Sequence, residues 1–132
     1  MMEIRSYGTI WKWAVVNATK EQLHVVQCLE RDLKELVSLP YCAKIAFVHK
    51  LEGPEWLGSW DGTNIELHNT LVNAALYRVL LHEIGHMVGL EHSSGIMAAT
   101  VPRSGKLSVA NRRKWCLELA RKIVKHNIGK IK

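Results

Sequence analysis

The sequence predicts one α+β (α/β) domain over residues 1–132, with a mixed, twisted sheet of about four to five strands and helices packed on it. Three observations predict this fold. Two apolar, strand-like segments enclose an amphipathic helical stretch, a turn dipeptide separates two further strand-like segments, and two helix-length stretches follow. At 132 residues, the chain is long enough to bury about two-thirds of the surface that it exposes when unfolded.

The first part of the chain is predicted to be a strand–helix–strand unit. Residues 10–17, IWKWAVVN, alternate and then become apolar, as an inner strand does. Thr19 and Gln22 form a capping box for a helix over residues 20–38. Residues 43–50 form the second strand, and such a crossover is right-handed and joins parallel strands. The apolar stripe of the helix consists of Leu23, Val26, Leu29, Leu33, Leu36 and Val37.

An antiparallel hairpin and two helices are predicted next. The segments EWLGSW and NIELHN flank Asp61-Gly62, a dipeptide typical of tight hairpin turns. A helix is expected over about residues 71–88. Ser108 can cap a last helix over residues 109–126. The apolar positions of that helix are Val109, Trp115, Cys116, Leu119, Ala120 and Ile123.

The stretch HEIGHMVGLEHSSGIM contains the residues typical of a metal site. His82 and His86 are four residues apart, so a helix places both rings on one face, where they can bind one tetrahedral ion. Glu83 completes the H-E-x-x-H pattern, in which the carboxylate acts as a base rather than as a ligand. Gly89 can take the left-handed conformation that ends a helix, which lets His92 approach the same ion. Three nitrogen ligands with a fourth position left for water indicate a catalytic zinc site.

These residues match the H-E-x-x-H-x-x-G-x-x-H signature, and the chain therefore resembles the metzincin metallopeptidases. Ser93, directly after the third histidine, resembles the matrixin branch, the matrix metalloproteinase-like catalytic domains. Met97 is where the Met-turn of the family falls, a tight turn whose methionine lies under the metal ligands. The resemblance covers about residues 73–102. It implies a small metzincin-like zincin fold with an active-site helix, a Met-turn and a C-terminal helix.

The resemblance implies a zinc-dependent endopeptidase that acts on proteins or peptides. One catalytic Zn²⁺ is expected, held by His82, His86 and His92. Glu83 is expected to take a proton from the zinc-activated water and to pass it to the leaving amine. The retained Glu83 argues against one alternative, a non-catalytic zinc-containing binding module. Hydrolysis of cell-wall (peptidoglycan) peptides stays open as a second alternative.

Two departures from related families limit the expected ligands. Ala99 occupies the position where astacin- and serralysin-like members carry a tyrosine, so no tyrosine ligand is expected. Matrixins also bind a structural zinc and calcium ions on a loop rich in His and Asp. Only His68 and Asp61 are available there, so one metal is expected.

The family places the substrate against an antiparallel edge strand beside the zinc. The corresponding segment here is residues 55–60, with Gly58, Ser59 and Trp60 as the expected substrate strand. An extended peptide could add to it through main-chain hydrogen bonds. The alternative, that Trp56 and Trp60 are only core residues, stays open.

The net charge of +6 is unevenly placed. Residues 1–102 carry 8 basic and 11 acidic side chains, a net of −3, whereas residues 103–132 carry 10 and 1, a net of +9. We expect the basic C-terminal helix to act on the choice of an anionic partner and not on the chemistry. Nucleic acid is not expected as that partner, because a charged helix face is usually only solvated.

The cysteines and the N-terminus bear on the compartment. Cys28, Cys42 and Cys116 are odd in number and widely spaced, which predicts buried apolar side chains and gives no support to a Cys28–Cys42 disulfide. No segment has the ~18 uninterrupted apolar residues of a membrane span, and the N-terminus lacks a secretory pattern. The localisation stays open, with cytoplasmic synthesis favoured, and no inhibitory propeptide is expected. The oligomeric state also stays open, with a monomer favoured.

Overall fold

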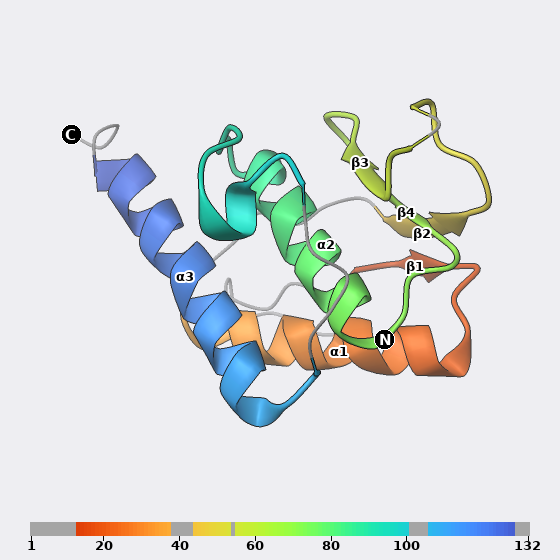
Figure 1. Ribbon diagram of the computed structural model, residues 1–132, viewed down its shortest axis with the longest axis horizontal. Coiled ribbons are helices and arrows are strands. Elements are labelled where there is room, and N and C mark those ends of the chain that lie inside the picture. Colours follow the sequence, from red (N-terminus) through yellow and green to blue (C-terminus); the bar gives the residue numbers. More distant parts are fainter. Residues whose placement is uncertain (1–12, 38–43, 54, 101–105, 129–132) are drawn as a thin grey trace.

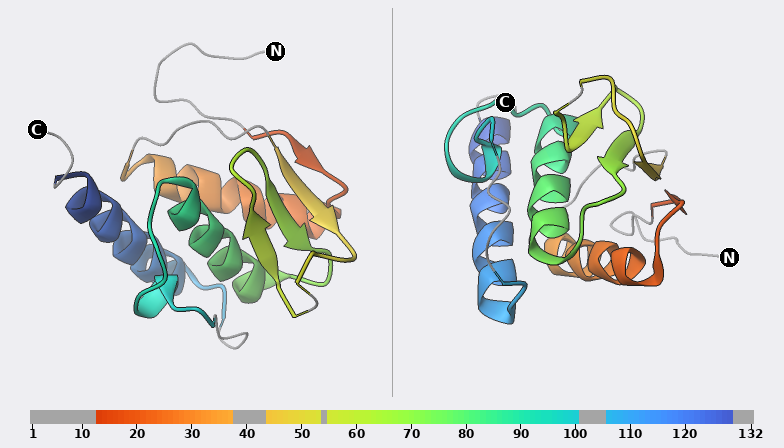
Figure 2. Two further views of the ribbon diagram at one scale, coloured as in Figure 1. Left: turned by 90° about the horizontal axis from the view of Figure 1, so that it is seen from above. Right: turned by 45° about the vertical axis from the view of Figure 1, so that its right-hand side comes forward.

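The computed structural model describes residues 13–37, 44–53, 55–100 and 106–128 (Figure 1). In chain order its elements are β1 (Val15–Val16), α1 (Lys20–Lys34), β2 (Ile45–Val48), β3 (Gly58–Trp60), β4 (Ile65–His68), α2 (Asn73–Met87), the 3-10 turn η1 (Gly95–Met97) and α3 (Val109–Ile128). Within these ranges, the three α-helices lie on one side of the sheet, and α2 lies between α3 and the strands (Figure 2). None of these helices is long and apolar enough to span a membrane.

The strands of the described ranges form one mixed sheet in the order β1-β2-β4-β3. The first three strands are parallel: Ile45 pairs with Val15 on one side and with Ile65 on the other. Strand β3 runs antiparallel to β4, with Trp60 opposite Ile65. The structure confirms the predicted α+β fold with an antiparallel edge strand. Since β3 is the last strand of the sheet, one edge of its backbone has no strand partner among the described residues.

A tight turn joins β3 to β4, as the sequence predicts. The Asp61 carboxylate accepts hydrogen bonds from the backbone N–H groups of Thr63 and Asn64, at 2.8 and 2.7 Å. Gly62 follows with φ +97°. This turn sets the length and register of the edge strand.

The start of α1 is tied to the segment that leads into α2. Thr19 Oγ1 accepts a hydrogen bond from the Gln22 N–H at 3.1 Å, and Gln22 Oε1 accepts one from the Thr19 N–H at 2.9 Å. The predicted capping box is therefore confirmed. The amide nitrogen of Gln22 donates to the carbonyls of Asn69 and Leu71, at 2.8 and 2.9 Å. The buried side chain of Gln22 thus completes the N-terminal cap of α1 and anchors the residues before α2.

The buried face of α1 differs from the predicted stripe. The helix ends at Lys34, whereas the prediction ran to residue 38, which lies outside the described residues. Leu36 lies beyond that end, where helical spacing no longer applies, and it is 42% exposed. Leu23 is exposed as well, because the packing of α1 against both α2 and α3 turns the buried face toward Val25 and Cys28.

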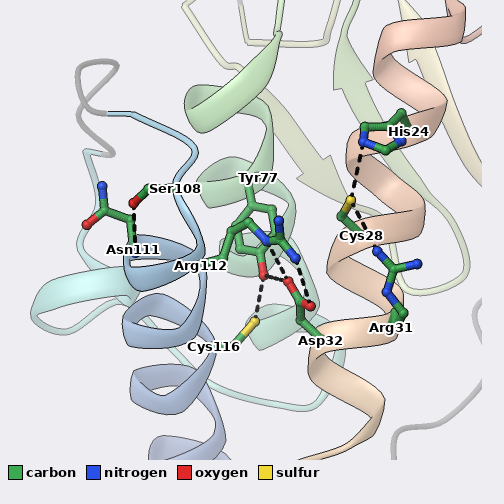
Figure 3. A network of polar contacts seen from close by, with 9 residues as sticks. All are labelled: His24, Cys28, Arg31, Asp32, Tyr77, Ser108, Asn111, Arg112 and Cys116. Atoms are coloured by element: carbon green, nitrogen blue, oxygen red, sulfur yellow. Dashed lines mark hydrogen bonds and ion pairs between the residues drawn. The ribbon is translucent and has the colours of Figure 1, made fainter.

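Four polar side chains join the three helices (Figure 3). Asp32 of α1 accepts hydrogen bonds from the Tyr77 hydroxyl of α2 at 2.8 Å and from Arg112 Nε of α3 at 2.9 Å. Because the Tyr77 proton is directed at Asp32, the Cys116 thiol is the donor in its 2.9 Å contact with the Tyr77 oxygen. Burial raises the pKa of Cys116 to about 11, so this thiol keeps its proton at neutral pH.

The helices α2 and α3 agree with the predicted ranges to within a few residues. Ser108 Oγ accepts a hydrogen bond from the Asn111 N–H at 3.1 Å and so caps α3 as predicted. Val109 is 66% exposed, and the predicted apolar stripe is wrong there. The first turn of α3 contacts α1 through the polar pair of Arg112 and Asp32 instead. Cys28 and Cys116 are free and buried, as predicted, and Cys42 lies outside the described residues.

Candidate metal centre

Three histidine side chains converge at the end of α2. His82 and His86 lie one turn apart on the helix, and His92 lies on the segment that returns after it. Their ring centroids are 4.7, 5.1 and 4.9 Å apart, and one nitrogen of each ring lies within 4.8 Å of the other two. Gly89 has φ +98°, a left-handed conformation that reverses the chain after α2. The turn at this glycine therefore brings the third ring to the first two.

Backbone carbonyls determine which ring nitrogens carry protons. His82 Nδ1 donates to the Ile96 oxygen at 3.0 Å, and His86 Nδ1 donates to the Leu90 oxygen at 2.9 Å. A carbonyl oxygen only accepts, so each Nδ1 is protonated and each Nε2 presents a lone pair. The two Nε2 atoms lie 3.1 Å apart. Nitrogen ligands of a tetrahedral zinc ion are about 3.4 Å apart, so these facing lone pairs fit a shared cation.

The electrostatics of His82 also suit a metal ligand. Burial lowers its pKa, and the neighbouring His86 and His92 rings lower it further, while the hydrogen bond to Ile96 acts in the opposite direction. His82 therefore favours the neutral form, which is the form that binds a metal.

Glu83 is buried beside these rings. Burial raises the pKa of its carboxyl group to about 7. A divalent cation at the three rings would favour the carboxylate and lower this pKa again. With a cation bound, Glu83 is therefore expected as a carboxylate, the form that can accept a proton from a water molecule.

Met97 lies between α2 and α3. Its side chain is fully buried against Gly85 of α2, with Leu119 of α3 nearby. The Met97 carbonyl accepts a hydrogen bond from the Ser93 N–H at 2.9 Å, which closes the turn after His92. The turn thus packs against the same helix that holds the first two histidines.

Two side chains of α3 that were not predicted as part of the site contact this turn. Glu118 Oε2 accepts a hydrogen bond from the Ile96 N–H at 2.8 Å, and Lys122 Nζ lies 3.5 Å from Ser93 Oγ. A signal for the first was present in the sequence, since Glu118 is the one acidic residue in the strongly basic range 103–132.

The histidines and Glu83 line one side of a cleft of about 550 Å³. This volume is typical of ligand-binding clefts. The rest of its lining comprises Glu55, Trp56, Leu57, Gly58, Ser59, Trp60, Val79, Ala99 and Thr100. Trp56 is 50% exposed and is therefore not a core residue, whereas Trp60 is partly buried against the core. The cleft thus lies between α2 and the edge strand of the sheet.

The matrixin family model matches residues 12–112 of this chain, which is more than half of its 132 residues. Comparisons with curated proteins and with solved structures find no match. The matched range contains the three histidines, Glu83 and Met97, and it ends before Glu118.

Proposed function

Because the chain belongs to the matrixin family of metallopeptidases, we propose that it is a zinc-dependent endopeptidase that cleaves extended segments of proteins or peptides. The observation that supports this function best is the content of one cleft. Three histidine rings converge there beside a buried glutamate, and an edge strand forms the opposite side. A site that only held a metal for structural reasons would need no buried carboxylate next to its ligands.

The ring nitrogens of His82, His86 and His92 are the proposed ligands. When bound there, zinc supplies a Lewis acid for the scissile carbonyl and lowers the pKa of its water to about 7. Glu83 then takes the proton from the attacking water and delivers it to the leaving amine. Its position on α2, one residue after His82, directs its carboxylate into the cleft without making it a ligand.

The backbone of Gly58, Ser59 and Trp60 is the proposed substrate strand. One edge of β3 has no strand partner among the described residues, so an extended peptide can add there by main-chain hydrogen bonds. Such binding gives affinity with little demand on sequence. The exposed indole of Trp56, at one end of this strand, offers a flat apolar surface to a substrate side chain.

Metal analysis combined with cleavage of a mixed peptide library tests this function. We expect one zinc per chain and cleavage at internal peptide bonds, lost with a chelator and restored by zinc. His86→Ala should lose the zinc, and His49→Ala, an exposed position after β2, should keep it. A zinc-loaded protein that cleaves no peptide would contradict the proposal in favour of a binding module. Cleavage confined to cell-wall peptides would favour the alternative hydrolase.

A further inference from the structure

We propose that Glu118 is a positioning residue of the metal centre, which acts on His82 through the backbone of Ile96. This inference rests on the proposed function only in treating His82 as a zinc ligand. Glu118 lies on α3, beyond the range that the matrixin model matches.

The first contact joins Glu118 to the turn. Its Oε2 accepts the Ile96 N–H at 2.8 Å, and Ile96 is 2% exposed. A hydrogen bond to an ionised acceptor is roughly twice as strong as one between neutral groups. Because the bond is partly buried, salt screens it less than it would screen a surface contact. The carboxylate thus holds the backbone on one side of Ile96.

The second contact joins Ile96 to the metal site. On its other side, the Ile96 carbonyl accepts the Nδ1–H of His82 at 3.0 Å. The intervening backbone is a closed 3-10 turn, in which the Ala98 N–H donates to the Gly95 carbonyl at 3.0 Å. Because this hydrogen bond closes the turn, a shift of the Ile96 N–H that Glu118 holds also shifts the Ile96 carbonyl. That carbonyl orients the His82 ring. This carbonyl also determines that Nε2 of His82 presents its lone pair toward His86.

The close approach of Glu118 requires a glycine at position 95. Gly95 has φ +66°, and a Cβ at this position would overlap the Glu118 carboxylate. Lys122, one turn further along α3, reaches Ser93 on the same turn. Two neighbouring side chains of one helix face therefore contact the turn that follows His92. This arrangement places the carboxylate against backbone and leaves it little freedom to relocate.

The test compares Glu118→Ala and Glu118→Gln with Lys114→Ala, an exposed control position on α3. The readouts are the zinc dissociation constant, from competition with a chromophoric chelator, and the visible spectrum of the cobalt-substituted protein. Outer partners of metal ligands contribute about 10- to 100-fold in affinity. For Glu118→Ala we expect roughly 10-fold weaker zinc binding and an altered cobalt spectrum. This is the lower end of the range, because Glu118 acts on His82 through the backbone of Ile96 and not directly. Glu118→Gln should lie between the parent protein and Glu118→Ala, since its neutral amide oxygen accepts the same hydrogen bond but holds it less strongly.

Unchanged zinc affinity in Glu118→Ala would overturn the inference, and so would a Gln variant as weak as the Ala variant. A mutant cycle adds a second criterion. Gly95→Ala should weaken zinc binding in the parent protein and do so less in the Glu118→Ala background, where the overlap is removed. Additive effects would contradict the coupling.

The outcomes also separate this inference from the proposed function. A parent protein that binds zinc but cleaves nothing removes the peptidase and leaves the role of Glu118 intact. A parent protein that binds zinc and cleaves peptides, with Glu118→Ala unchanged, removes only the role of Glu118. A parent protein that binds no zinc removes both.

Discussion

The carboxylate of Glu83 lies directly against the backbone of Gly58. A Cβ at Gly58 would lie 3.2 Å from Glu83 Oε2 and 3.0 Å from Val79 Cγ1. The proposed base on α2 and the proposed substrate strand β3 therefore meet with no side chain between them. A peptide that adds to β3 would lie beside the carboxylate, which is the geometry that proton transfer to a leaving amine requires.

Glu83→Gln should keep the fold and the zinc and lose most peptide hydrolysis. The amide has nearly the same shape but cannot accept the proton, so we expect turnover to fall roughly 100- to 10,000-fold. The measurement is turnover of a metal-replete variant, with Glu52→Gln, an exposed glutamate on the loop after β2, as the control. Undiminished turnover in Glu83→Gln would show that another group acts as the base.

Gly58→Ala should lower kcat more than it raises KM. The added methyl group would press on Glu83 and Val79, so the base must shift by a few tenths of an ångström. Misplaced catalytic groups cost up to about 100-fold, and we expect roughly 10-fold for this smaller shift. Thr63→Ala, at an exposed position in the turn after β3 and outside the cleft lining, is the control and should leave kcat unchanged. Equal kcat values for Gly58→Ala and the parent protein would contradict the proposed contact between base and strand.

Asp32→Asn should destabilise the protein at neutral pH but not in acid. Burial alone raises the pKa of Asp32, but hydrogen bonds from Arg112 and Tyr77, with the charges of Arg112 and Arg31, together hold the pKa below its usual 3.8. A carboxyl group with a lowered folded-state pKa stabilises the fold above its unfolded-state pKa. This stabilisation is lost as the pH falls through the folded-state value.

The expected loss for Asp32→Asn is about 1–2 kcal/mol in the free energy of unfolding at pH 7, given that the pair is partly solvated. The difference from the parent protein should narrow below about pH 4. Urea unfolding of both proteins across this pH range, with zinc removed from each, measures it. A difference that stays constant down to the acid limit would show that the Asp32 charge is not its source.

Neutralising the exposed basic face of α3 should affect partner choice and not chemistry. The substitutions are Lys114→Gln, Arg121→Gln and Lys125→Gln, all at exposed positions. Lys122 is left unchanged because it contacts Ser93 in the turn beside the metal site. Hydrolysis of a neutral peptide should not change, whereas an acidic protein should be cleaved more slowly at low salt and equally at high salt.

A matched control removes the same charge elsewhere. Lys20→Gln, Lys34→Gln and Lys44→Gln are exposed positions on α1 and before β2. An equal effect of both triple variants on the acidic substrate would mean that net charge alone matters. A large loss on the neutral peptide that salt does not alter would mean that the α3 face supports the active site directly.

The sequence alone was sufficient for features that depend on residues close along the chain. The spacing of His82 and His86 determines their separation on any helix, whatever packs around it. The capping box of α1 and the turn after β3 are local in the same sense, since each bonds residues within a few positions. These short-range geometries explain why the fold class was predictable.

Contacts between distant elements were decided only by tertiary packing. The hydrogen bond between Glu118 and Ile96 joins residues 22 positions apart in the sequence, and the bond between Arg112 and Asp32 joins residues 80 positions apart. Leu23 has the right period for the core of α1 and is nevertheless exposed, because two other helices determine which face of α1 is covered. Helical period specifies which side chains share a face, but the angle and offset at which helices pack depend on side chains from all of them at once. Glu118 stands out in the sequence as the one acidic residue of the range 103–132, but its contact with Ile96 could be identified only in the folded chain.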